Sequence, residues 1–207
     1  MNDSARADRL DTVTEAKRKI ILDAALRVFA DKGLHEANVR AIAKEAGYTP
    51  GAIYGYFPSK EHIYAAALRE SLTRLRDATE SAAAAADSAR ERLIAAGIAF
   101  FDFYDAHPRD LDLGFYLFGG GIQPRGLSEE LNRELNTALL ATLEPARLAT
   151  VELGVSDTET SELTADMFAH ASGLLLLAHT KRIELFHLDA RQLMLNHLDQ
   201  LATNAAD

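Results

Sequence analysis

Residues 33–60 read GLHEANVRAIAKEAGYTPGAIYGYFPSK, and the small, apolar and capping residues of this stretch decide the fold. Asn38 is a strong helix N-cap, because its side-chain oxygen can accept a hydrogen bond from the first turn. The residues after it place an apolar face inward at spacings of three and four, formed by Val39, Ile42 and Ala46. The pattern predicts a short helix that ends at Gly47, a residue suited to left-handed backbone.

A second short helix is predicted directly after this glycine. Thr49 is another good N-cap, and Pro50 stands at the first helical position, where its missing N–H costs nothing. This one-turn helix runs through Tyr54, and Ser59 then caps a long helix that begins at Lys60. Two short helices joined by a tight glycine turn form a helix-turn-helix motif.

The rest of the chain also has helical periodicity, and no segment alternates as a strand would. A first helix is expected from Lys17 to Asp31, with Gly33 stopping it. Its apolar stripe consists of Ile20, Ile21, Ala24, Ala25, Val28 and Phe29. Later helices are expected at 60–80, 87–106, 108–118, 128–152, 157–180 and 190–203, with Gly119–Gly121 as the clearest loop. The fold class is therefore all-α, with an N-terminal three-helix domain at 15–75 and a helical domain at 76–207.

Two of these helix starts carry a capping-box pattern, in which a polar residue is followed three positions later by Glu or Gln. They are Ser156 with Glu159, and Asp189 with Gln192. Both patterns support the predicted starts at 157 and 190.

Composition restricts the compartment and the chemistry. The chain has 207 residues and no Cys, which excludes disulfides and thiolate zinc sites. Its longest bulky apolar run, Leu174–Leu177, is far too short to span a membrane. No nucleophile motif, Gly-rich phosphate loop or His-Glu-x-x-His pattern occurs, so we expect no cofactor, no metal and no catalytic site. A cytoplasmic protein without a membrane partner is expected.

Charge is unevenly distributed along the chain, whose net charge is -9. Residues 17–64 hold eight cations against five acids, whereas residues 71–207 hold 11 cations against 21 acids. Such a division would let the first part approach a polyanion while the remainder is repelled, although chance unevenness explains it equally well.

The stretch at 33–60 resembles the DNA-binding domain of the TetR/AcrR family, and the similarity extends from Glu15 to about Leu75. Its most specific part is Ile53-Tyr54-x-Tyr56-Phe57-x-x-Lys60. The resemblance implies a homodimeric regulator that binds operator DNA through the helix-turn-helix and senses a small molecule in its C-terminal domain. One position departs from the family pattern, because Ala37 stands where Thr or Ser is common.

Nine residues are candidates for DNA contact. A recognition helix needs small or polar residues at its front, and Thr49 and the helix N-terminus can donate hydrogen bonds to a phosphate. The resemblance adds the two tyrosines and Lys60 as contacts to the DNA backbone. Arg40 could reach a base edge or a phosphate, or be only a solvated cation. The candidates are Asn38, Arg40, Thr49, Pro50, Gly51, Ala52, Tyr54, Tyr56 and Lys60.

Aromatic residues concentrate between residues 100 and 118, where Pro108 breaks the helix and lets the chain fold back. Such a face suits an apolar or aromatic effector, and an ordinary aromatic core explains the same pattern. Asp166 and His170 lie four residues apart on one helical face. They could bind a metal ion together or hold a ligand between them, but we expect a plain hydrogen bond between the two side chains. The candidate effector contacts are Phe100, Phe103, Tyr104, His107, Phe115, Tyr116, Asp166 and His170.

The last two helices carry small and apolar residues at helical spacing. The resemblance implies that they pair with a symmetry mate in a four-helix bundle, whereas burial within one subunit is the alternative. The candidate dimer contacts are Gly173, Leu174, Leu177, Met194, His197, Leu198 and Leu201. The function expected from the sequence is a dimeric repressor that a largely apolar effector releases from a palindromic operator. The alternative is an all-α enzyme or ligand carrier with a vestigial helix-turn-helix.

Overall fold

The computed structural model describes residues 2–115 and 127–205, and these are helical with no strand among them, which confirms the all-α class. The described residues fall into two compact units, the first comprising residues 2–69 and 127–132 and the second residues 70–115 and 133–205. Within the described part of the chain, no helix is long and apolar enough to cross a membrane.

The first unit begins with α1 (Asn2–Glu36), which is bent at Gly33, where the backbone is left-handed with a φ of 68°. The predicted break at Gly33 is confirmed, but the predicted start at Lys17 is wrong. Residues 2–16 contain no Gly or Pro that would stop a helix, so the helix continues to the N-terminal end of the described chain.

The helix-turn-helix forms through the predicted caps. The Ala41 N–H donates to Asn38 Oδ1 at 3.0 Å at the start of α2 (Val39–Ala46). Gly47 ends α2 with a φ of 73°. The Ala52 N–H donates to Thr49 Oγ1 at 3.3 Å at the start of α3 (Pro50–Tyr54). Each cap satisfies a backbone donor that a helix end leaves without a partner.

The core of the first unit joins these elements to the beginning of α4 (Lys60–Ala84). The α1 stripe is buried as predicted except for Ile20, which lies at the edge of the stripe and is half exposed. The Phe29 ring meets the edge of Tyr64 on α4, with centroids 6.3 Å apart. The buried residues of this core include Ile21, Val28, Phe29, Ile42, Ile53, Phe57, Ile63 and Tyr64. The burial of Ile53 fixes which side of α3 faces outward.

The second unit contains the remainder of α4 with five further α-helices and a short 3-10 helix. They are α5 (Ala89–Ala106), α6 (Pro108–Phe115), α7 (Glu129–Glu152), α8 (Asp157–His179), η2 (Arg182–Phe186) and α9 (Ala190–Asn204). The first residues of α7 belong to the first unit. The starts of α8 and α9 are confirmed, and Ser156 with Glu159 forms the predicted capping box. At α9 the Gln192 N–H donates to Asp189 Oδ1, but the predicted return bond is absent because the Gln192 side chain donates to Asn196 Oδ1 instead. The predicted loop Gly119–Gly121 lies outside the described residues.

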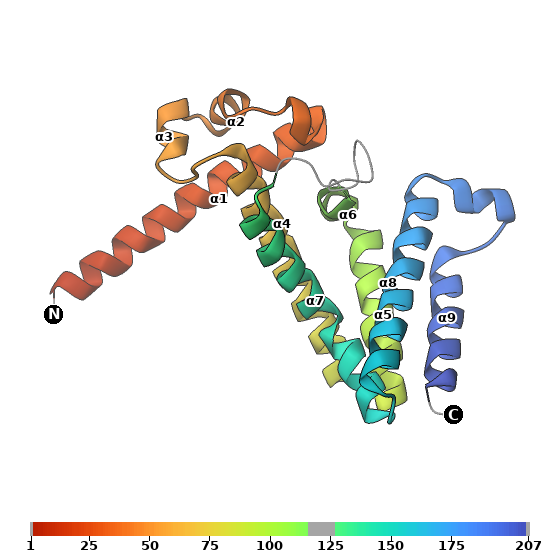
Figure 1. Ribbon diagram of the computed structural model, residues 1–207. Coiled ribbons are helices and arrows are strands. Elements are labelled where there is room, and N and C mark those ends of the chain that lie inside the picture. The colour runs from red at the N-terminus through yellow and green to blue at the C-terminus, as the bar shows by residue number, and fades with distance from the viewer. Residues whose placement is uncertain (1, 116–126, 206–207) are drawn as a thin grey trace. The chain divides into compact units, whose positions relative to one another are not determined.

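Helices α5, α8 and α9 lie side by side in the second unit (Figure 1). The three helices approach one another closely at Gly97 of α5, where an added Cβ would lie 2.4 Å from Leu198 Cδ2 and 3.1 Å from Met167 Sδ. Met194 and Leu198 of α9 have no exposed surface. Glycine at residue 97 therefore allows α5 to pack directly against α9.

Candidate nucleic-acid interface

The outward side of α3 carries small residues and one aromatic ring. Thr49, Pro50 and Gly51 are exposed, Ala52 is half-buried, and Tyr54 exposes 55% of its surface. No side chain of the first half of α3 extends far from the backbone, so another molecule can approach the helix closely. A helix that enters the major groove needs such access.

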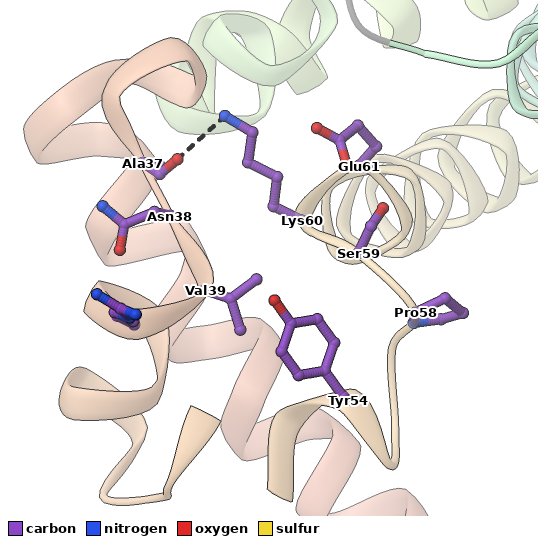
Figure 2. A pocket seen from close by; sticks show the side chains of 9 residues that line it. Ala37, Asn38, Val39, Tyr54, Pro58, Ser59, Lys60 and Glu61 are labelled. Atoms are coloured by element: carbon purple, nitrogen blue, oxygen red, sulfur yellow. Dashed lines mark hydrogen bonds between the residues drawn. The ribbon is translucent and has the colours of Figure 1, made fainter. Parts of the chain in front are cut away.

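An open hollow of about 530 Å³ lies beside α3 in the first unit (Figure 2). Tyr54 and Val39 face each other across it, and Lys60 extends along one side toward Ala37. The Lys60 ammonium donates a hydrogen bond to the Ala37 carbonyl at 3.1 Å. The lining residues are Ala37, Asn38, Val39, Arg40, Tyr54, Pro58, Ser59, Lys60 and Glu61.

Four of the predicted DNA contacts line this hollow, namely Asn38, Arg40, Tyr54 and Lys60. Two of the four are cations and one is a phenol, so the hollow offers positive charge and hydrogen-bond donors of the kind that bind phosphate. Glu61 adds an opposing charge at the rim. The structure thus brings together residues that are 22 positions apart in the chain.

Arg18 of α1 supports the loop after α3, a role that the sequence analysis missed. Its Nη1 donates to the Tyr56 carbonyl at 2.8 Å, and its guanidinium lies 4.3 Å from the centroid of the Phe57 ring. A cation over an aromatic face is attracted to the ring, and a charged donor strengthens the hydrogen bond. The two contacts position Tyr56, which is half-buried, and hold the buried Phe57 in place.

Comparison with known proteins places this geometry in a family. The profile of the family described as "Bacterial regulatory proteins, tetR family" matches residues 21–67, which include α2, α3 and the start of α4. The uncharacterized HTH-type transcriptional regulator YdgC of Bacillus subtilis is 30% identical over 79% of this chain and 83% of its own length. The chain therefore belongs to the TetR family of bacterial regulatory proteins.

Two further comparisons define how far the similarity extends. The HTH-type transcriptional regulator BetI of Rhizobium meliloti is 42% identical, but the match covers 38% of this chain and 39% of BetI. The crystal structure of the transcriptional regulator FadR from Bacillus subtilis in complex with stearoyl-CoA covers 89% of this chain and 97% of its own, with a TM-score of 0.70 and 22% identity. The fold is shared along almost the whole chain.

Three of the predicted effector contacts form a continuous aromatic cluster in the second unit. Phe103 and Phe100 each meet Tyr104 edge to face, with centroids 5.4 Å and 5.2 Å away, and all three side chains are buried. The cluster continues to Phe168 of α8, which the sequence analysis did not single out, 5.9 Å from Phe100. Burial, reinforced by the charge of Asp110, raises the pKa of Tyr104, so its phenol stays protonated.

His107 joins this cluster at its exposed end, since its ring centroid lies 4.7 Å from that of Phe103. His107 is exposed at the junction of α5 and α6, and its Nδ1 lies 2.7 Å from the Phe103 carbonyl. The Phe115 side chain and all of Tyr116 lie outside the described residues. Their part in the effector site stays a prediction.

Asp166 and His170 belong to a three-residue cluster that includes His197 of α9. Asp166 Oδ2 lies 3.2 Å from His197 Nε2, although the two are not aligned for a hydrogen bond. The rings of His170 and His197 stack with centroids 3.8 Å apart. Burial and the neighbouring His197 lower the pKa of His170, and Asp166 opposes this shift. The predicted pairing of Asp166 with His170 is therefore corrected to a pairing with His197.

No group of three or more His, Asp or Glu residues in the described ranges has an arrangement that could hold a metal ion, and the chain has no Cys.

Several predicted dimer contacts are already buried within the chain. Met194 and Leu198 expose 0% of their surface, and Leu201 and Leu174 expose 5% and 6%. A side chain without exposed surface has none to lose on dimerisation, so for these four residues the alternative, burial within one subunit, is what the structure shows. Gly173 is exposed, Leu177 and His197 are half-buried, and Leu176, not predicted, is 54% exposed. These residues remain open to a partner.

Proposed function

We propose that this protein is a dimeric transcriptional regulator, most simply a repressor, that binds a palindromic operator through α3 and is released by a small effector. One observation carries the proposal. A capped helix with small outward residues stands beside a hollow that presents Arg40, Tyr54 and Lys60. Because the DNA that such a regulator binds is in the bacterial cytoplasm, we propose that compartment, and we propose no catalytic role.

The exposed residues of α3 favour recognition by shape and backbone contact. Pro50, Gly51 and Ala52 offer no side-chain donor to a base edge, and Thr49 uses its hydroxyl oxygen as the helix cap. Ala37, which replaces the more common hydroxyl residue, is buried and accepts the Lys60 hydrogen bond. Specificity then depends heavily on how easily a sequence adopts the bound DNA geometry.

The aromatic cluster of the second unit supports an apolar effector. The FadR structure with the same fold is a complex with stearoyl-CoA, a ligand with a long apolar chain. An effector shifts the DNA-bound state only by its differential affinity for the two conformations. We expect a coupling of about 1 to 3 kcal/mol, or roughly 5- to 150-fold in operator affinity.

The intact helix-turn-helix argues against an enzyme or carrier in which this motif is vestigial. A domain without function would be under no constraint to retain Lys60, Tyr54 and the caps of α2 and α3. All of these are present, and Lys60, Tyr54 and Asn38, the N-cap of α2, line one hollow.

The test is to select DNA sequences with the purified full chain and to measure its mass by sedimentation. We expect a dimer and a palindrome with half-sites about one helical turn apart, roughly 34 to 36 Å. A monomer at micromolar concentration, or selection of no common sequence, would contradict the proposal.

Lys60→Gln tests the role of the hollow in DNA binding. Glutamine keeps N–H donors on a side chain one bond shorter and carries no charge, and thermal unfolding verifies that the variant is folded. Operator affinity should fall, and the slope of its salt dependence should decrease by about one per subunit. Lys32→Ala, which removes an exposed cation at the end of α1, is the matched control and should leave the slope unchanged.

A further inference from the structure

The ion pair between Arg74 and Asp110 differs from the others in the described chain. Arg74 Nη2 of α4 lies 2.5 Å from Asp110 Oδ1 in the first turn of α6. The Asp110 side chain exposes 12% of its surface, whereas the other carboxylates in described ion pairs expose between 41% and 76%. Asp110 is the buried acid of this set.

A buried carboxylate with one cationic partner is a poor device for stability. Removing a charge from water is costly, and an apolar pair of similar size would often stabilise the fold more. Breaking such a pair is strongly unfavourable, because the buried charge is then uncompensated. The pair consequently makes the contact between α4 and α6 sensitive to whatever else binds Arg74.

Arg74 is placed to bind a second anion. Half of its side chain is exposed, and its guanidinium carries five N–H donors. Only the Nη2 nitrogen donates to Asp110. The guanidinium also lies 5.6 Å from the centroid of Phe103, at the edge of the aromatic cluster. A cation on its open side and an apolar cluster next to it are complementary to a molecule with a charged head and an apolar chain.

The surrounding charge makes this cation more selective. Residues 71–207 hold 11 cations against 21 acids, so their field repels anions in general. The neighbouring Arg76 lies 3.5 Å from Asp77 and 3.6 Å from Glu80, and both of these acids are exposed. Arg74 differs from Arg76 because its guanidinium lies beside the aromatic cluster, so an anion bound to it can place an apolar chain near Phe103.

We propose that Arg74 is the anchor for the head group of the effector, and that the effector is an amphiphile with an anionic head and an apolar chain. This inference rests on the proposed function and specifies the ligand class. The head binds the exposed side of the guanidinium and shares it with Asp110, while the chain enters the cluster around Phe103. Sharing weakens the hold of Asp110 on Arg74 and so loosens α6 from α4.

The test compares three probes of one chain length by calorimetry on the full protein at neutral pH. Decanoate carries a carboxylate, decanoyl-CoA carries phosphates farther from the chain, and decanol carries no charge. We expect one or both anionic probes to bind at least tenfold more tightly than decanol. If only one of them does so, it identifies the head group as a carboxylate or a phosphate; if both do, either anionic head is accepted.

Variants then assign the preference to Arg74. Arg74→Gln should lose about tenfold in affinity for the preferred anion with no change for decanol. Arg76→Gln, on the same helix, is the matched control and should change neither. Asp110→Asn should strengthen anion binding several-fold, because it removes the competing carboxylate, and it decides the question if Arg74→Gln does not fold.

Three results would overturn the inference: decanol equal to both anions, no binding of any probe, or Asp110→Asn without gain in anion affinity. Operator binding by the protein without any probe is measured in parallel. If operator binding is intact while the probes fail, the proposed function stands and the assignment of Arg74 is wrong.

Discussion

Gly51→Ala tests whether α3 approaches DNA closely without disturbing the fold of this helix. Gly51 is exposed on α3, its φ is not positive, and an added Cβ would meet nothing within 4 Å. The substitution should therefore leave the protein at least as stable, since Ala favours a helix over Gly by up to about 1 kcal/mol. Any loss of operator affinity must then come from contact between the new methyl group and DNA, not from a change in the fold.

The expected loss follows from close approach to DNA. If the backbone of α3 lies against the groove, one extra methyl group overfills a packed contact, at a cost of about 1 to 3 kcal/mol by analogy with overpacked cores. This corresponds to roughly 5- to 150-fold in affinity for each half-site. Fluorescence anisotropy with the selected operator measures the affinity, and thermal unfolding verifies the stability.

Gly114→Ala is the matched control for this experiment. It adds the same methyl group to helix α6, where the nearest atom to the new Cβ is Tyr104 Oη at 3.6 Å, an ordinary contact. Its operator affinity without effector should equal that of the natural chain. If Gly51→Ala also binds the operator with unchanged affinity, α3 does not approach DNA closely and the argument from its small residues is wrong.

Two further predictions concern the stability of the second unit. Gly97→Ala should destabilise the fold by about 1 to 3 kcal/mol, before the gain in helix propensity, because its Cβ would lie 2.4 Å from Leu198 Cδ2. In a Leu198→Ala background this penalty should disappear, and urea titration measures both variants. Stability should also fall as the pH falls from 7.5 to 5.5, because the pKa of His170 is lowered in the folded state and the unfolded chain binds the proton first. His170→Gln should flatten the urea midpoints over this range, and an unchanged pH dependence in that variant would refute the assignment.

Local chemistry made much of the fold predictable from the sequence. Asn38, Gly47 and Thr49 act on backbone groups within a few residues, so their roles follow from position alone. The capping box at Ser88 and Glu91 has the same short-range pattern and could have been found in the same way. The 3-10 helix η2 has no comparable start: Lys181 before it is left-handed and makes no side-chain capping bond.

The site was predictable only where its residues are close in sequence. Nothing near Arg18 indicates that it bonds a carbonyl 38 positions away, and the pairing of Asp166 with His197 depends on how α8 and α9 pack. The apolar stripe of α9 shows the same limit. Periodicity identifies a face that is buried, but it cannot tell whether the covering surface belongs to the same chain or to a partner.

The contacts of Arg18 with the distant residues Tyr56 and Phe57 matter for the exchange of DNA-binding domains between regulators of this family. A graft that begins at the motif itself, near residue 33, would omit the guanidinium that holds the loop behind α3. The transplanted recognition helix would keep its own caps and sequence, yet its C-terminal end would depend on whatever the host supplies at that place. Chimeras should therefore be cut upstream of Glu15, so that the loop and its support are transferred together.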